Sequence, residues 1–335
     1  MITCYLQETG VGEDGLPVRG PVRRSRWEEN VPLPEGVVWI DLVAPTHWEE
    51  RLAESVIGAE LPTQEEMAEI ETSSRLYVEN GAVYLTATLL CGISEGKPGT
   101  TPVTFIAANN RLVTVRYDEP KAFPLAGYRL LKQRTEPISG AIALMNLLDA
   151  VVERMADILE AISAEIEAIS RAVFEAGVSD RRTEGPNYHD IIRAIGRQGM
   201  LTNRAQESLL SLSRTVAFLS LHIEEAGLNR HRGEMKSMTR DVRSLSDHAG
   251  SLDAKINFLL DAVLGLVNLD QSAIIKIFSV LAVVFMPPTL IASIYGMNFQ
   301  HMPELEWQYG YEVSIALMFI SAVGTYAFFR WKRWL

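Results

Sequence analysis

Two long uncharged apolar segments near the end of the sequence constrain its fold more than any other feature. Residues 277–303 contain no Asp, Glu, Lys or Arg, and the stretch 277–295 could cross a hydrocarbon layer of about 30 Å as a helix. The second segment, 313–329, is near the lower length limit for a span. A buried hairpin in a soluble core is the alternative, but such cores seldom hold two runs this close together. The sequence therefore predicts two transmembrane helices, at 271–296 and 313–330.

The charges that flank these segments indicate the orientation of the chain in a lipid bilayer. Lys276 precedes the first segment, and basic residues crowd the tail 331–335, whereas the connecting loop 297–312 has glutamates and no Lys or Arg. By the positive-inside rule both chain ends are cytoplasmic and the loop is periplasmic. Two spans cannot enclose a pore, so conduction would require several copies around an axis.

The capping, turn and strand patterns of residues 1–135 predict a cytoplasmic α/β domain, in which helices pack on a small mixed sheet. Helices are expected to begin at Thr46 and Thr63, because each is followed three residues later by Glu, the pattern of a capping box. Asn80-Gly81 and Asn109-Asn110 are typical of hairpin turns between strands. The expected strands are 2–6, 37–42, 75–78, 83–90, 103–107 and 112–117.

Residues 136–270 predict a long helical stalk, because Gly and Pro become sparse and apolar residues recur at helical spacing. One helix is expected to end near Gly177, a second to span about 187–225, and a third to run from about Gly233 to Gly296. At about 1.5 Å per residue this third helix would be on the order of 90 Å long. It would carry the first transmembrane segment rigidly into the cytoplasm.

Motifs for catalysis or cofactor binding are weak, so we expect no enzyme and no resident cofactor. Gly10, Gly12 and Gly15 match a dinucleotide fingerprint, but Leu16-Pro17 follows where a helix is required, which favours a flexible loop. The six histidines and two cysteines have no ligand spacing. With 31 Lys and Arg against 42 Asp and Glu, the formal charge of -11 argues against nucleic acid as a partner and suits cations.

One face of the first transmembrane helix carries a stripe of mostly small or weakly polar residues at alternating spacings of three and four. Small residues let membrane helices approach closely, so the stripe could be a packing seam. It could equally line an axial pore, and periodicity alone leaves both readings open. We call these residues the stripe: Ser272, Ile275, Ser279, Ala282, Met286, Thr289 and Ser293, with Phe278 beside them as a further pore-lining candidate.

The first transmembrane helix ends at Tyr295-Gly296-Met297-Asn298. Gly at a left-handed C-cap position followed by Asn is an ordinary helix stop. A helix end also leaves carbonyl groups unsatisfied, and a ring of copies would point them at one axis. The two interpretations are compatible.

These residues resemble the CorA family of magnesium and cobalt transporters, in which Gly-Met-Asn closes the first of two C-terminal membrane helices. The segments 274–280, 285–290 and 302–305 and the basic ending at 332–335 are also similar to that family. The similarity is dense from about Glu234 onward and only architectural before it.

The resemblance implies a funnel-shaped homopentamer in the inner membrane, with an α+β or α/β cytoplasmic domain, long stalk helices and a pore lined by the first membrane helices. Residues 295–298 would form the selectivity filter, and Ile275, Phe278, Ala282 and Met286 an apolar constriction. Glu304 and Glu306 of the external loop would attract cations, a role that rests on their charge alone.

The resemblance also implies a function, which is influx of Mg²⁺, with Co²⁺ and Ni²⁺ as further ions. This influx would be driven by the membrane potential and gated by cytoplasmic Mg²⁺. The carboxylate that binds regulatory Mg²⁺ is expected at Asp241, with Asp247 and Asp253 as alternatives. Zinc-transporting relatives have another residue between the Gly and the Asn, so Met297 favours magnesium. The alternatives are zinc transport and a membrane-anchored oligomeric sensor that conducts nothing.

Overall fold

The structure is a computed structural model that describes residues 1–11, 17–28, 33–34, 36–132, 138–174, 187–297, 302–303 and 307–332. The chain divides into two compact units, Met1–Leu259 and Leu260–Leu335. We refer to them as unit 1 and unit 2. Unit 1 includes both the sheet, expected at 1–135, and most of the helical stretch expected at 136–270.

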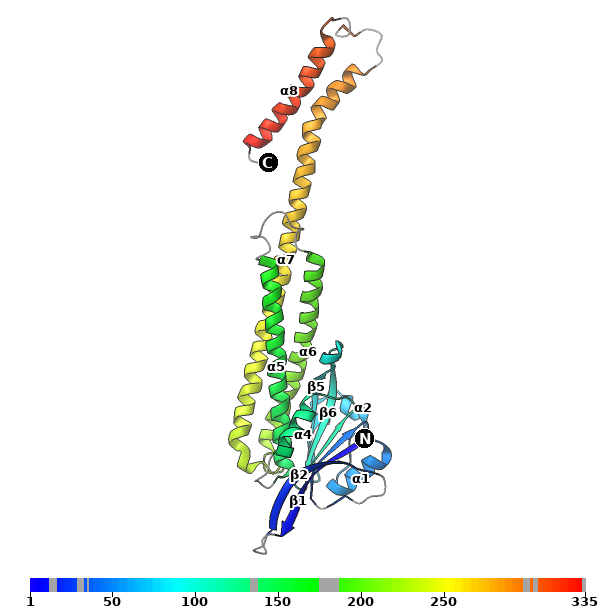
Figure 1. The fold of residues 1–335 in the computed structure, drawn as a ribbon, viewed down its shortest axis with the longest axis vertical. Helices are drawn as coiled ribbons and strands as arrows, with labels where there is room; N and C mark the ends of the chain where they lie inside the picture. Colours follow the sequence, from blue (N-terminus) through cyan, green and yellow to red (C-terminus); the bar gives the residue numbers. More distant parts are fainter. Residues whose placement is uncertain are drawn as a thin grey trace. The chain divides into compact units, whose positions relative to one another are not determined.

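Unit 1 is built on a seven-stranded sheet in the order β2-β1-β3-β7-β6-β5-β4 (Figure 1). Strands β3 and β7 pair in parallel, with Trp39 opposite Leu112, and the other neighbours pair antiparallel. All six expected strands are present, with ends shifted by a few residues. The strands are β1 (Ile2–Val11), β2 (Pro17–Arg26), β3 (Val37–Val43), β4 (Leu76–Glu79), β5 (Ala82–Cys91), β6 (Gly99–Ala108) and β7 (Arg111–Arg116).

The two faces of the sheet bury different helices, because successive side chains of a strand point to opposite sides. Helices α1 (His47–Ile57) and α2 (Gln64–Ala68) bury Ala53, Ile57 and Met67 in a core that includes Cys4 and Ile40. The short helix α3 (Thr72–Arg75) leads into β4. Both expected capping boxes are confirmed: the backbone N–H groups of Thr46 and Thr63 donate to the carboxylates three residues later, at 2.9 and 2.8 Å.

On the opposite face, aromatic residues bind the sheet to α4 (Ala122–Lys132). The rings of Tyr5 and Trp39 stack with centroids 4.3 Å apart, and Phe123 of α4 lies 6.1 Å from Trp39. A short 3₁₀ helix, η1 (Ile93–Glu95), joins β5 to β6. Large buried rings of this kind account for much of the energy of a core.

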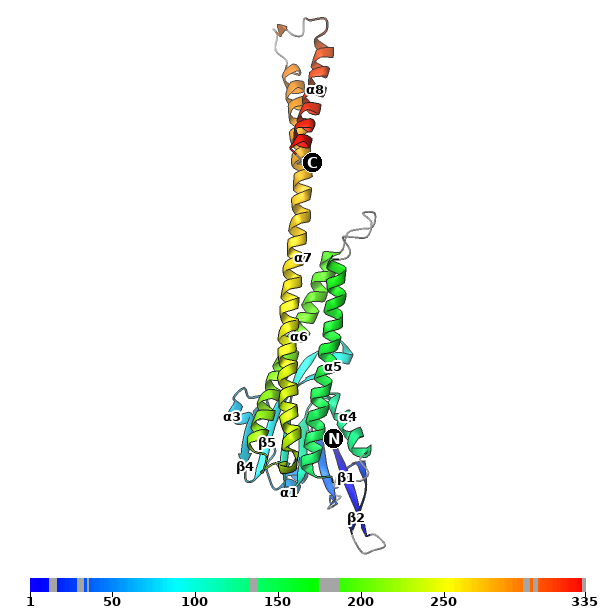
Figure 2. The ribbon, with the colours of Figure 1, turned by 90° about the vertical axis from the view of Figure 1, so that its left-hand side faces the viewer.

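Three long helices follow α4 in the chain (Figure 2). They are α5 (Gly140–Phe174), α6 (Tyr188–Leu221) and α7 (Arg232–Tyr295). A second 3₁₀ helix, η2 (Asn229–His231), precedes α7. Helices α5 and α6 end at Phe174 and Leu221, a few residues before the predicted ends near Gly177 and at about 225. Helix α7 is continuous over 64 residues and includes Pro287 and Pro288.

Strand β2 and helices α3 and α4 are among the elements that the sequence pattern did not predict. Strand β2 (Pro17–Arg26) pairs with β1, although its arginines and prolines give no apolar alternation. Helix α4 has Pro124 within its first turn. Gly10 lies in strand β1, so the flexible loop expected at the Gly10-Gly12-Gly15 pattern is wrong at its first residue. Residues 12–16 lie outside the described residues.

Unit 2 contains the end of α7 and α8 (Gly310–Trp331). Both helices are long and apolar enough to cross a membrane, and only 6% of the most apolar window of each is buried. These apolar windows are therefore not buried in a core of the single chain. Helix α8 begins three residues before the predicted start at 313.

Candidate ion pathway on helix α7

The stripe of α7, hereafter the α7 stripe, is exposed in the single chain. All seven members and Phe278 are exposed to solvent, and the largest side chains, Ile275, Phe278 and Met286, are 65%, 68% and 64% exposed. A contiguous exposed patch of large apolar side chains marks a surface that meets a partner or a membrane. The stripe is therefore available to line a pathway or to contact other copies.

Helix α8 packs against a different face of α7. The less exposed positions of α7 in unit 2 recur at helical spacing, and so do those of α8, which runs beside the end of α7 (Figure 1). From residue 268 to the end of α7 these positions are Val280, Val284, Pro287, Pro288, Ile291 and Tyr295. In α8 they are Ser314, Ile315, Met318, Ser321, Ala322, Thr325 and Phe329.

The α8-facing positions and the α7 stripe lie on opposite sides of α7. At about 100° per residue, Met286 lies about 240° around the helix from Val280, and Thr289 about 180° from it. Packing between α7 and α8 of the same chain therefore does not explain the stripe. Periodicity left open a packing seam and a pore. The structure excludes a seam between α7 and α8 of one chain, so the stripe could form either a seam or a pore between copies.

Two hydroxyl groups of the stripe are oriented by their own helix. Ser272 Oγ donates to the Asn268 carbonyl at 2.8 Å, and Thr289 Oγ1 donates to the Phe285 carbonyl at 2.7 Å. With its proton used in this way, each hydroxyl oxygen can only accept further hydrogen bonds from outside the helix. Water molecules around a cation present hydrogens outward, so such acceptors suit a hydrated ion.

The end of α7 differs from the predicted left-handed C-cap. Gly296 does not have a positive φ, and its N–H donates to the Ala292 carbonyl at 2.9 Å, while the Met297 N–H donates to Ile294 at 3.3 Å. The last turn thus tightens without reversing the chain. A Cβ on residue 296 would lie 3.1 Å from the Ala292 carbonyl oxygen, which is tighter than most Cβ contacts. Asn298, Glu304 and Glu306 lie outside the described residues.

The three candidate regulatory carboxylates are not brought together within one chain. Asp241 and Asp247 are exposed and Asp253 is half-buried, and steps of six residues place the three about 120° apart around α7. Among the described residues, no group of three or more His, Cys, Asp or Glu side chains could hold a metal ion. Shared coordination by these three residues would require other copies of the chain.

Asp241 lines a cavity of about 410 Å³ between α5 and the start of α7. Asp149 and Glu234, which the sequence analysis did not single out, line the same cavity. Arg129 pairs with Asp149 at 2.9 Å, and the His231 ring lies 3.0 Å from Glu234. Asp149 and Asp241 are 92 positions apart, so only the packing of α5 on α7 brings them to one cavity.

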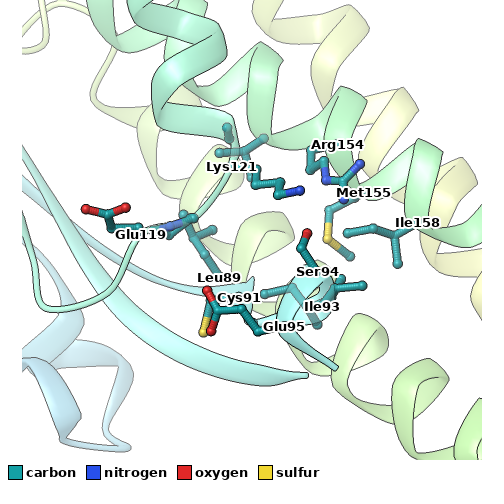
Figure 3. Close-up of a pocket in the computed structure, with 15 residues that line it drawn as sticks. Leu89, Cys91, Ile93, Ser94, Glu95, Glu119, Lys121, Arg154, Met155 and Ile158 are labelled. Atoms are coloured by element: carbon teal, nitrogen blue, oxygen red, sulfur yellow. The ribbon is translucent and has the colours of Figure 1, made fainter. Parts of the chain in front are cut away.

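A smaller cavity of about 50 Å³ lies where η1, the start of α4 and α5 meet (Figure 3). Lys121, just before α4, and Arg154 of α5 line it on one side, and Cys91 and Glu95 line it from the sheet side. Burial, together with the negative charges of Asp118 and Glu95, raises the pKa of the Cys91 thiol against the opposing effect of Arg204. A thiol with a raised pKa is a poor nucleophile at neutral pH, so this cavity is not arranged for covalent catalysis.

Comparison with known proteins gives a consistent picture over most of the chain. A family model described as "CorA-like Mg2+ transporter protein" matches residues 34–333. The magnesium transport protein CorA of Yersinia pseudotuberculosis is 34% identical over 299 residues, which cover 89% of this chain and 92% of that protein. The magnesium transport protein CorA of Escherichia coli K12 is 34% identical over 313 residues, covering 93% and 96%.

Solved structures share the fold. The CorA magnesium transporter from Methanocaldococcus jannaschii matches with a TM-score of 0.77 at 18% identity, over 100% of this chain and 99% of that one. The full-length CmaX protein matches with a TM-score of 0.69 at 15% identity, over 100% and 98%. With a family model across most of the sequence and relatives at one-third identity over nearly their full length, this chain belongs to the family of CorA-like Mg²⁺ transporter proteins.

Proposed function

We propose that this chain is one subunit of a homopentameric channel in the inner membrane that carries Mg²⁺ into the cytoplasm, with Co²⁺ and Ni²⁺ as further ions. The first transmembrane helix of each subunit would line the pore with the α7 stripe, and both chain ends would lie in the cytoplasm. The observation that carries this proposal is the sidedness of α7, in which Val280 is buried and the α7 stripe is exposed.

The chemistry of the predicted filter suits an ion that keeps its water. Mg²⁺ dehydrates reluctantly, so full removal of its octahedral shell would have to be compensated by many strong ligands. The Gly296 carbonyl and the Asn298 side-chain carbonyl are neutral acceptors that can receive hydrogen bonds from bound water. Met297 would complete the ring, whereas Tyr295, also expected in the filter, is half-buried on the side of α7 that faces α8. Repeated around an axis, such groups hold the ion and still release it.

Movement of the ion needs no chemical energy source. An inside-negative potential of 100 mV favours entry of a divalent cation by about 4.6 kcal/mol, twice the value for a single charge. Glu304 and Glu306 would raise the cation concentration at the entrance by their charge. The exposed apolar residues Ile275, Phe278 and Met286 would form a constriction that closes the pore by excluding water.

We further propose that cytoplasmic Mg²⁺ closes the channel by binding between subunits at Asp241, with Asp247 or Asp253 as the alternative carboxylate. Single aspartates fit this ion, because Mg²⁺ is usually held by one or two carboxylates together with several waters. Binding shifts a gating equilibrium only if the ion prefers the closed state. The carboxylates of neighbouring copies would repel one another without the ion and so favour opening.

Flux of Mg²⁺ into liposomes that contain the purified full-length protein tests the proposal. An inside-negative potential should drive saturable uptake, and Asn298→Ala should abolish it. Asn203→Ala serves as the matched control, because Asn203 is exposed on α6 in unit 1. Hexaamminecobalt, which resembles hydrated magnesium, should compete with uptake.

Three outcomes of this experiment would reject parts of the proposal. Zinc flux that hexaamminecobalt does not affect would assign the channel to zinc. A folded protein that binds Mg²⁺ but transports no ion would be an oligomeric sensor. A protein that stays monomeric in the bilayer would contradict the shared pore altogether.

A further inference from the structure

A second cavity in unit 1, of about 190 Å³, lies between α6 and the edge of the sheet formed by β4 and β5. Its lining is unusual in combining guanidinium groups with hydroxyl groups. The lining residues that carry the argument are Arg75, Arg214, Thr88 and Ser211, with Glu207 as the one carboxylate among them. None of these residues belongs to the ion pathway on α7.

Arg75 has a donor group that no protein acceptor satisfies. One terminal nitrogen donates to Thr88 Oγ1 at 2.8 Å, but the Nε atom is buried and has no hydrogen-bond partner among the described residues. A buried donor without an acceptor costs about 1–3 kcal/mol. Such a group in a folded protein indicates a ligand, an ion or a water molecule that accepts from it.

The hydroxyl groups around Arg75 add further donors. Ser211 Oγ accepts from the Thr88 backbone N–H at 2.8 Å, and Thr88 Oγ1 accepts from Arg75. Since an oxygen that accepts keeps its own proton free to donate, both hydroxyl groups can point a hydrogen toward a ligand. The two hydroxyl groups therefore add donors to those of the arginines.

The charges around the cavity also favour an anion. Arg214 is exposed on α6, and its positive charge acts on Arg75. Burial lowers the pKa of the Arg75 guanidinium, the charge of Glu207 opposes this effect, and Arg214 adds to it. No ion pair joins Glu207 to either arginine in the part of the chain that the structure describes. Glu207 offsets one of the two positive charges, so the charged residues that line the cavity retain one positive charge in excess, which favours an anion.

We propose that this cavity is a binding site for a small oxyanion, held by Arg75 and Arg214 and by the hydroxyl groups of Thr88 and Ser211. Guanidinium groups match the paired oxygens of phosphate and carboxylate. A volume of about 190 Å³ is smaller than the pockets of about 300 Å³ or more that hold drug-sized ligands, so the ligand is small. Its binding would connect α6 to β5 and to α3.

Inorganic phosphate is the probe for this site, applied to the full-length protein in detergent without Mg²⁺ and at constant ionic strength. Calorimetric titration should show saturable binding, and the unfolding temperature should rise as sites fill, because the ligand binds the folded state. Arg214→Gln should weaken the affinity at least tenfold. Arg193→Gln, at an exposed position of the same helix, should leave it unchanged.

Competing anions define the ligand class. Acetate that displaces phosphate extends the class to carboxylates, whereas acetate without effect assigns the site to phosphate groups; both results support an oxyanion site. Chloride that is as effective as phosphate would overturn the proposal. So would the absence of saturable phosphate binding, or equal affinity in Arg214→Gln and the unaltered protein. The result does not depend on whether the protein conducts ions.

Discussion

At the scale of single residues, Gly140 shows how closely the stalk approaches the sheet. Its N–H donates to the Asn110 carbonyl at 2.8 Å, directly beside the hairpin turn between β6 and β7. A Cβ at this position would lie 2.2 Å from the backbone carbonyl carbon of Arg111. Because the obstacle is backbone, it cannot rotate away as a flexible side chain could. The close contact with the Arg111 backbone, and not the helix geometry, therefore requires glycine as the first residue of α5.

We expect Gly140→Ala to destabilise the protein by about 2 kcal/mol or more, because either α5 or β7 must shift to admit the methyl group. Thermal unfolding of the full-length protein in detergent measures the effect. Gly196→Ala in α6 is the control, since no atom lies within 4 Å of its added Cβ and alanine favours helices. The control should be neutral or slightly stabilising. Equal losses at both positions would contradict the close contact.

A second prediction at this scale concerns Glu49, which is buried and accepts from the Thr46 backbone N–H. Burial by itself raises the pKa of this carboxyl, but the hydrogen bonds from Thr46 and the N-terminal ammonium outweigh it and lower the pKa overall. A lowered pKa in the folded state contributes stability above the unfolded value of about 4.3, and this stability is lost as pH falls through the folded value.

Glu49→Gln should therefore lower stability at pH 7 by about 1 kcal/mol, as expected for a lost capping carboxylate. The difference between the two proteins should narrow as the pH falls from about 5 toward the lowered pKa. Unfolding temperatures measured across this range provide the check. A difference that does not vary with pH would mean that the charge of Glu49 has no part in stability.

At the scale of elements, α7 is long enough to pack in the core of unit 1 and to form the exposed apolar segment of unit 2. In unit 1 it buries Val242, Ala249, Leu252 and Ile256, and Lys255 pairs with Glu167 of α5 at 3.4 Å. In unit 2 the same helix is mostly exposed and apolar. Continuity through Pro287 and Pro288 agrees with the tolerance of transmembrane helices for proline. One helix thus joins the soluble core to the proposed pore.

The sidedness of α7 leads to a prediction about two equivalent threonines. Thr289 on the α7 stripe and Thr325 on α8 each donate to a carbonyl of their own helix, at 2.7 and 2.8 Å. Valine has nearly the same shape but no hydroxyl oxygen to accept from hydrated cations. Thr289→Val should reduce Mg²⁺ flux in liposomes several-fold, and Thr325→Val should leave it near the original rate. The reverse order would place α8 along the pathway instead.

At the scale of the whole molecule, the features that one chain leaves incomplete are the ones that an assembly of copies would complete. The α7 stripe has no partner on its own α8, and Asp241, Asp247 and Asp253 point in different directions around one helix. Rotational symmetry would bring each stripe to a common axis and set carboxylates of neighbouring copies opposite one another. Transport and its regulation would then both depend on the same assembly.

Regulation by internal Mg²⁺ gives the prediction at this scale. In liposomes, Asp241→Asn should raise the internal Mg²⁺ concentration that halves the flux at least threefold, because the closed state loses a ligand for the ion. Asp247→Asn and Asp253→Asn test the alternative carboxylates. Glu165→Gln, at an exposed position of α5, should have no effect. Unchanged inhibition in all three aspartate variants would remove α7 from the regulatory site.

Much of the molecule could be predicted because its signals are local in the sequence. The transmembrane segments, the capping boxes at Thr46 and Thr63 and the long uninterrupted α7 each depend on hydropathy or on residues a few positions apart. The Gly296-Met297-Asn298 tripeptide likewise indicated the family, which the comparisons confirmed. Strand β2 was missed because its charged residues hide the alternation that marks a strand, and its pairing with β1 is a tertiary interaction.

The sequence by itself determined that this chain has two apolar spans on a large acidic body and that it resembles the CorA family. Length, charge and hydropathy are properties of the sequence that do not depend on tertiary contacts. Only the tertiary structure decided that the α7 stripe faces away from α8, that Asp149 and Asp241 line one cavity and that Arg75 and Arg214 line another. Each of these pairs residues from different elements. Helical periodicity shows which residues share a face, but packing decides what that face meets.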